Sequence, residues 1–257
     1  MVLEMTFNIA LAGKGGTGKT TLAALIIRQL VENGKRPILA VDADANANLN
    51  EALGIEVEDT IAELLARVNN NREALPAGMT KDQYVALKVH ESLAESDDVD
   101  LMVMGGPEGA GCYCFVNNLV RNFVHKLNQK YPYTVMDNEA GLEHLSRRTT
   151  QNIDILFVTS DASVRGIRSA GRVKRLVDSM ALDIKKMYLV VTRVGDGSID
   201  SLHGEIQKTG LELIVAIPSD ADVFNYDLQG KPLVDLPDDN PVVNAVDELM
   251  RKSSILP

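Results

Sequence analysis

The sequence predicts an α/β fold: a mainly parallel sheet of seven or eight strands with helices on both of its faces. Short apolar runs alternate along the chain with segments whose apolar residues recur at helical spacing. Such alternation implies right-handed crossovers and a parallel sheet that is covered on both sides. A chain of 257 residues, of which 45% are hydrophobic, can build the sizeable core that this fold needs. We therefore expect ligands at the carboxyl ends of the strands.

Each predicted strand is a short apolar run. In chain order these runs are 7–12, 37–41, 101–104, 133–136, 155–158, 188–191 and 213–217. Amphipathic segments between and after them predict helices at 19–33, 116–129, 163–179, 201–208 and 240–252. The more polar segment 56–98 is a candidate helical insertion that covers or contacts something. Because no linker, repeat or low-complexity run interrupts the pattern, we expect a single domain over residues 1–257.

Charge and composition narrow the range of partners. The chain has 26 Lys and Arg against 36 Asp and Glu, a formal charge of −10 and a pI near 4.9. These values oppose unspecific attraction to nucleic acid or anionic lipid. No apolar run approaches the roughly 18 residues of a membrane span, and the start, MVLEMTFNIALAG, lacks the basic region of a signal peptide. We expect a soluble cytoplasmic protein with reduced thiols, whose partners include no nucleic acid and no membrane.

A candidate phosphate-binding loop follows the first predicted strand. Residues 13–20, GKGGTGKT, match the P-loop pattern between a strand and a helix, which is the context that the motif requires. Backbone N–H groups of such a loop converge on phosphate oxygens, and the helix start adds its dipole. Lys19 would reach the β and γ phosphates, and Thr20 would offer its hydroxyl to Mg²⁺. The nucleotide and Mg²⁺ site expected here comprises Gly13, Lys14, Gly15, Gly16, Thr17, Gly18, Lys19, Thr20 and Thr21.

The loop holds a second lysine, Lys14, directly after its first glycine. With this lysine, KGGTGKTT resembles the deviant Walker A motif of the P-loop ATPase family that includes nitrogenase iron protein, MinD, ParA and arsenite-pump ATPases. The resemblance implies slow hydrolysis of ATP and face-to-face dimers around two nucleotides. It also implies that Lys14 crosses to the partner's ATP, in the manner of an arginine finger, and is catalytic together with Lys19. The alternative is a solvated surface lysine.

Two acids follow the second predicted strand. The run VDADAN at 41–46 resembles the first switch of the same family, because carboxylates at the end of a strand lie near the phosphates. By the family pattern Asp44 positions the attacking water and is catalytic, whereas Asp42 is the supporting acid. Capping of the following helix by an aspartate is the alternative reading.

The strand 133–136 leads into DNEAGLEH, which resembles a Walker B aspartate followed by a second switch. Asp137 would reach Mg²⁺ through a water molecule. Gly141 would let the backbone approach the γ-phosphate and move after hydrolysis. His144 is expected to be structural.

Two later segments occupy the places where this family contacts the base. Thr192 and Arg193 lie where family members commonly carry an asparagine that reads the adenine edge, so Thr192 departs from the pattern. Pro218, Ser219 and Asp220 resemble the other base-contact loop, with Pro218 flanking the ring.

The only two cysteines, Cys112 and Cys114, follow a predicted strand and precede a predicted helix. Thiolates at a helix start have a lowered pKa. Two cysteines are too few for a closed soft-metal site, but a twofold axis would bring four together, which suits Zn²⁺ or Ni²⁺. The alternative is that they are small residues that pack a helix start.

GPEGAGCYC together with DNEAGLEH resembles the CooC group of nickel-delivery ATPases, which mature carbon monoxide dehydrogenase. The resemblance runs from about residue 6 to the C-terminus. It implies a homodimer that binds nickel or zinc through Cys112 and Cys114 and uses ATP to serve carbon monoxide dehydrogenase as its client. Two alternatives share the nucleotide motifs: a ParA- or MinD-like positioning ATPase and an iron–sulfur electron donor. The tail DELMRKSSILP, which is short, opposes the first, and the absence of further cysteines opposes the second.

Overall fold

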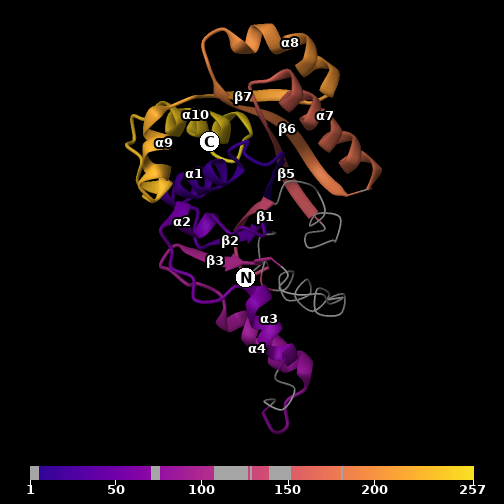
Figure 1. Ribbon diagram of the computed structural model, residues 1–257, viewed down its shortest axis with the longest axis vertical. Coiled ribbons are helices and arrows are strands. Elements are labelled where there is room, and N and C mark those ends of the chain that lie inside the picture. The colour runs from indigo at the N-terminus through magenta and orange to yellow at the C-terminus, as the bar shows by residue number, and fades with distance from the viewer. Residues whose placement is uncertain (1–5, 71–75, 107–126, 128, 139–151, 181) are drawn as a thin grey trace.

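The protein is described by a computed structural model, which covers residues 6–70, 76–106, 127, 129–138, 152–180 and 182–257. Within these residues seven parallel strands form one sheet in the order β3-β2-β4-β1-β5-β6-β7 (Figure 1). The strands are β1 (Phe7–Gly13), β2 (Ile38–Ala43), β3 (Val99–Val103), β4 (Tyr133–Asn138), β5 (Asn152–Asp161), β6 (Asp183–Val194) and β7 (Glu212–Pro218). The predicted fold class is confirmed, and each strand overlaps a predicted apolar run.

Helices lie between most of the strands. They are α1 (Lys19–Glu32), α2 (Leu49–Leu53), α3 (Ile61–Asn70), α4 (Lys81–Glu91), α7 (Val164–Ser179), α8 (Ser198–Thr209), α9 (Ala221–Leu228), the 3-10 turn η1 (Leu233–Asp235) and α10 (Pro241–Lys252). The helices predicted at 19–33, 163–179, 201–208 and 240–252 are found within a few residues of their expected ends. Most of the helix predicted at 116–129 lies outside the described residues.

Polar side chains fix where several helices begin. Ser163 accepts a hydrogen bond from the Gly166 N–H at the start of α7, and Asn240 accepts one from the Val242 N–H at the start of α10. A side-chain oxygen at this position satisfies a backbone donor that the helix itself cannot pair. α10 also carries Pro241 at its first turn, where a missing N–H does no harm.

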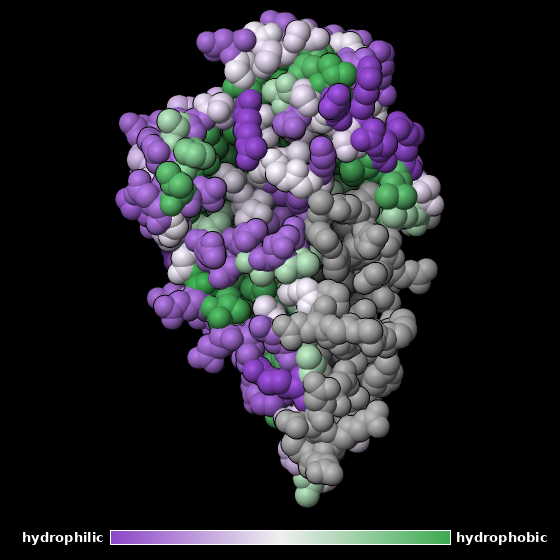
Figure 2. All heavy atoms as spheres, in the orientation of Figure 1, coloured by the Kyte–Doolittle hydropathy of each residue, from purple (hydrophilic) through white to green (hydrophobic). Residues whose placement is uncertain are grey.

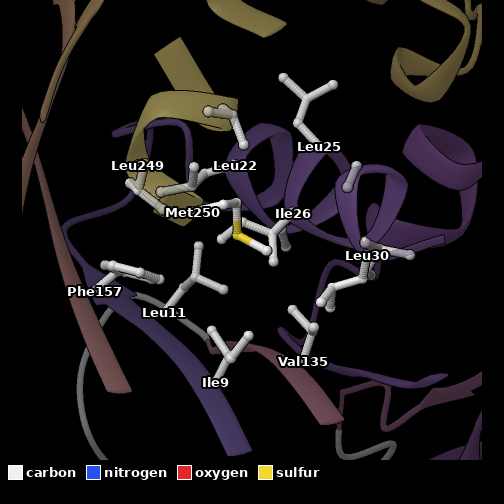
Figure 3. Close-up of a cluster of buried hydrophobic side chains, with 14 of the residues drawn as sticks. Ile9, Leu11, Leu22, Leu25, Ile26, Leu30, Val135, Phe157, Leu249 and Met250 are labelled. Atoms are coloured by element: carbon white, nitrogen blue, oxygen red, sulfur yellow. The ribbon is translucent and has the colours of Figure 1, made fainter. Parts of the chain in front are cut away.

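One large apolar cluster fills the space between one face of the sheet and the helices α1 and α10 that cover it (Figure 3). Ile9 and Leu11 of β1 and Phe157 of β5 point toward Ile26 of α1 and Met250 of α10, and all five side chains are fully buried. Strands that are buried on both faces consist of nearly continuous apolar residues, which is why the sequence predicts β1 and β2.

A second apolar cluster covers the opposite face of the sheet, under α4, α7 and α8. Val85 and Val89 of α4 are buried in it beside Ile61, the first residue of α3. The segment 56–98 thus contains two helices and contributes to the core. That it is an insertion stays a prediction. Among the described residues, no helix combines the length and the apolar character needed to cross a membrane.

Candidate functional site

The carboxyl ends of the parallel strands bring the predicted phosphate-binding residues to one edge of the sheet. β4 lies between β1 and β2, and Asp137 of β4 is in register with both Leu11 of β1 and Asp42 of β2. β1 ends at Gly13, from which the glycine loop leads into α1. Two predicted acids therefore lie beside the loop, although they are 95 positions apart in the chain.

The loop needs its glycines for two physical reasons. Gly16 and Gly18 have φ values of +76° and +74°, which side chains other than glycine rarely adopt. A Cβ on Gly13 would lie 2.3 Å from Oγ1 of Thr159 on the adjacent strand, a distance at which the two atoms collide. Lys19 opens α1 and is only 6% exposed, so its charge lies within the site. Lys14 is exposed.

Thr20 and Asp137 meet beside the loop. The Thr20 hydroxyl donates a hydrogen bond of 2.5 Å to Oδ2 of Asp137, which is 1% exposed. Oδ1 of Asp137 is buried and has no hydrogen-bond partner among the described residues. A hydroxyl next to a carboxylate with an unused oxygen is a donor set that Mg²⁺ accepts, directly or through water. These residues fit the predicted Mg²⁺.

The pKa of Asp137 is raised to about 7, and burial is the largest cause. The negative charges of Asp42 and Asp44 contribute to this rise, whereas the hydrogen bond from Thr20 and the positive charge of Lys19 oppose it. The net effect is a carboxyl group that a nearby cation would help to ionise.

Asp42 and Asp44 both accept local backbone hydrogen bonds. Asp42 is fully buried and accepts from the N–H groups of Asp44, at 3.0 Å, and Leu49, at 2.9 Å. Leu49 is the first residue of α2, so Asp42 does cap a helix start, and burial raises its pKa. Asp44 is half-buried and accepts from the backbone and side-chain N–H groups of Asn46. Their roles with water and Mg²⁺ stay predictions.

A cavity of about 690 Å³ opens beside the loop, between the start of α1, the ends of β6 and β7, and α9. Phe224 and Asp227 of α9, which the sequence did not single out, also line it. The structure brings together there seven of the predicted site residues: Gly18, Thr21, Thr192, Arg193, Pro218, Ser219 and Asp220.

Several polar groups at this cavity already have partners. The Thr192 hydroxyl donates to the carbonyl oxygen of Thr17 at 3.0 Å, and Asp220 caps α9 and accepts from Nδ2 of Asn240. The Ser219 N–H donates to the Val194 carbonyl oxygen. Arg193 is exposed and has a φ of +55°, a strained value for a residue with a side chain.

The other predicted site residues, Cys112, Cys114 and Gly141, lie outside the described residues, as does His144. In the part of the chain that the structure covers, no group of three or more His, Cys, Asp and Glu side chains is placed to hold a metal ion. This finding does not test the cysteine prediction.

A strand, a glycine loop and a helix whose Lys19 and Thr20 lie beside a buried aspartate define a P-loop nucleotide-binding protein. The family comparison agrees: residues 9–233 match the CobQ/CobB/MinD/ParA nucleotide binding domain. The chain belongs to this family.

Individual relatives resemble the chain along most of its length. An uncharacterized ATP-binding protein of Methanocaldococcus jannaschii is 43% identical over 95% of this chain and 97% of the relative. The carbon monoxide dehydrogenase accessory protein CooC of Rhodospirillum rubrum is 29% identical over 89% of this chain and 90% of its own. The cell division protein MinD of Aquifex aeolicus has the same fold, with a TM-score of 0.71, 21% identity and 98% of each chain covered.

These comparisons confirm the resemblance to the MinD and ParA family that the loop sequence indicated. CooC, to which the sequence showed a narrower resemblance, is one of several relatives and is 29% identical. The M. jannaschii relative, which is 43% identical, is described only as ATP-binding.

Proposed function

We propose that the protein binds Mg·ATP at the P-loop and hydrolyses it slowly to ADP and phosphate. The observation that carries this proposal is the meeting of Thr20 with the buried Asp137 beside Lys19. A cation and a hydroxyl-carboxylate pair at the start of a helix suit a triphosphate and its metal ion. The adjacent cavity of about 690 Å³ provides room for the base and sugar.

In the proposed reaction a water molecule attacks the γ phosphorus while the bond to the bridging oxygen of ADP breaks. Asp44 orients the water, and Lys19 binds the β and γ oxygens. When bound, Mg²⁺ neutralises charge on those oxygens. Lys14 is exposed, as a residue that reaches the ATP of a second subunit must be.

Replacement of Asp44 tests the hydrolysis. Asp44→Ala should bind ATP with nearly unchanged affinity and lose turnover, because it removes the group that orients water. Phosphate release and calorimetric binding measure the two properties. Asp178→Ala, at an exposed position of α7, is the control and should keep both. Normal turnover by Asp44→Ala would remove Asp44 from the mechanism.

A second proposal concerns what the ATPase serves. We infer a homodimeric metallochaperone in which Cys112 and Cys114 of both subunits hold one Ni²⁺ or Zn²⁺, and carbon monoxide dehydrogenase is the client. The CxC sequence and the similarity to CooC support it. Four thiolates across a twofold axis complete the ligand set that neither chain has alone.

Equilibrium dialysis of anaerobically purified protein with Ni²⁺ or Zn²⁺, with and without a nonhydrolysable ATP analogue, tests this second proposal. We expect one metal per dimer, weaker binding at lower pH because thiolates are needed, and loss in Cys112→Ala or Cys114→Ala with ATP binding retained. A full metal equivalent per monomer, or a brown 4Fe–4S absorption band, would contradict it. The 4Fe–4S band would support the alternative of an iron–sulfur electron donor. Binding of the protein to vesicles or DNA would favour a positioning ATPase.

A further inference from the structure

Three buried threonines from separate segments meet beneath the P-loop. Thr17 belongs to the loop, Thr159 to β5 and Thr192 to β6, and they are 1%, 1% and 5% exposed. The Oγ1 atoms of Thr17 and Thr159 are 2.7 Å apart. Oγ1 of Thr192 lies 3.0 Å from the Thr17 carbonyl oxygen.

The shorter hydrogen bonds of these hydroxyls fit one direction. Oγ1 of Thr17 donates to the carbonyl oxygen of Lys14 at 2.7 Å. Oγ1 of Thr159 also lies 3.3 Å from the carbonyl oxygen of Ala12, and Oγ1 of Thr192 lies 3.3 Å from that of Ser160. A hydroxyl has a single proton, so the arrangement that keeps the shorter contacts has Thr159 as the donor in its 2.7 Å contact with Thr17. Thr159 thus donates to Thr17, and Thr17 donates to the Lys14 carbonyl oxygen. Thr192 separately donates to the carbonyl oxygen of Thr17.

The two carbonyls that are held decide where two amides point. In a planar trans peptide the C=O and the N–H of the same unit point in opposite directions. Among the described residues the only cis bond is Arg36–Pro37, so the units after Lys14 and Thr17 are trans. Holding these carbonyls against the threonines therefore turns the N–H groups of Gly15 and Gly18 away from them, out of the protein interior. A P-loop presents amides to phosphate in this way.

We infer that Thr17, Thr159 and Thr192 are positioning residues, which set the P-loop for the triphosphate before nucleotide binds. The inference rests on the proposed binding of a nucleotide at this loop. It gives Thr192 a different role from the base contact that its sequence position indicates. A loop with four glycines loses much backbone freedom on ordering, so a preset loop binds phosphate more tightly than a loop that must be ordered at binding.

The test replaces hydroxyls while keeping side-chain shape. Thr192→Val and Thr159→Val remove one hydroxyl each, and Thr192→Ser restores it. Thr209→Val is the matched control, because Thr209 is also buried but, among the described residues, its hydroxyl bonds to Ile206 and Leu211 at the end of α8 and not to the loop. Calorimetry gives the affinities for ATP, GTP and tripolyphosphate. Hydrogen exchange without nucleotide compares the amides of residues 14–18 with those of residues 9–11 in β1.

If the threonines position the loop, Thr192→Val weakens the binding of all three ligands by a similar factor, on the order of tenfold, and Thr192→Ser recovers most of it. Both valine variants speed exchange at residues 14–18 more than at 9–11, and Thr209→Val does not. A change in the ratio of ATP to GTP affinity with unchanged tripolyphosphate binding would make Thr192 a base contact and overturn the inference. So would equal acceleration of exchange in loop and core.

Hydrogen exchange also distinguishes a failure of this inference from a failure of the proposed function. If the wild-type protein bound no nucleotide, the proposed function would fail, while exchange at residues 14–18 would still decide whether the threonines hold the loop.

Discussion

Asp137 shows how burial and charge act together at a single residue. It is almost fully buried, lies near Asp42 and Asp44, and uses only one carboxylate oxygen with a described partner. The nucleotide-free protein therefore contains a carboxyl group that is more stable when protonated, at a position where the proposed function needs it ionised.

This environment predicts a pH-dependent effect of Asp137→Asn on stability. The pKa of Asp137 is raised from 3.8 to about 7, so between these values the folded protein keeps a proton that the unfolded chain has released. Rising pH lowers the stability of the nucleotide-free protein across this window, and the loss is complete above about pH 7. The asparagine variant cannot ionise. It should melt near the wild-type temperature at pH 4 and above it at pH 8.

Thermal unfolding without nucleotide measures the difference, with Asp178→Asn as the control at an exposed position. A stability difference that is constant with pH would show that Asp137 ionises normally in the folded protein.

Phe224 is 65% exposed and lines the cavity beside the P-loop, and Figure 2 shows hydrophobic residues gathered over α9. An aromatic side chain at the lip of this cavity can pack against a base. We expect Phe224→Ala to weaken ATP binding by roughly three- to tenfold and to leave tripolyphosphate binding unchanged. Leu228→Ala is the control, since Leu228 is 73% exposed on the same helix but does not line the cavity. Equal losses in both variants would argue against a base contact.

The contacts of Thr192 and Asp220 at the cavity could not be predicted from the sequence. Thr192 and Asp220 were predicted near the base, and both line the cavity. The hydroxyl of Thr192 is bound to a loop residue 175 positions earlier, and the carboxylate of Asp220 caps a helix and meets Asn240. Such contacts depend on how strands are paired, which local sequence does not record. The motifs therefore predicted which distant residues lie at the site, such as Asp137 beside the loop, but not the hydrogen bonds that Thr192 and Asp220 make there.

At the scale of elements, the sequence predicted best the segments that bury one complete face. α7 and α10 have apolar stripes at helical spacing and were predicted within a few residues. α9 buries no residue and α2 has only five residues, so neither produces a periodic pattern. β6 has 12 residues, but its predicted run covered four, because the burial of this strand is concentrated near its carboxyl end.

The packing of α10 predicts a large stability effect. Met250 is fully buried against α1 and β1 (Figure 3). Met250→Ala should lower the free energy of unfolding by about 2–5 kcal/mol, because it leaves a cavity in the core. Glu248→Ala, on the exposed side of the same helix, should change it by no more than about 0.5 kcal/mol. Urea titration measures both. Equal effects would mean that helix propensity, and not core packing, determines the contribution of α10.

At the scale of the whole molecule, the proposed dimer must overcome a formal charge of −10 on each copy. Like charges of this size oppose association, and salt screens them. We expect ATP to drive dimer formation, with tighter association near 0.15 M salt than at low ionic strength. Sedimentation in ATP and in ADP measures this, and a monomer that ATP does not change would contradict it.

Lys14 is the residue through which the dimer would act on hydrolysis. Lys14→Gln should bind ATP normally and hydrolyse it at least about a hundredfold more slowly, because the partner's γ-phosphate loses its neutralising charge. Lys208→Gln, at an exposed lysine of α8, is the control and should keep normal turnover. Full activity in Lys14→Gln would leave Lys14 as a solvated side chain.

The cavity beside the P-loop is closed by residues far along the chain. Leu22 and Leu25 line one side, and Phe224, Leu233 and Val246 line the other. During translation the P-loop leaves the ribosome long before these last residues do, at a pace of about 5–20 residues per second. A nascent chain that ends near residue 215 has its phosphate loop but lacks the wall that α9 and α10 supply. The cavity beside the loop therefore has its complete wall only after residue 246 has emerged, so the phosphate loop precedes the rest of the proposed ATP site during synthesis.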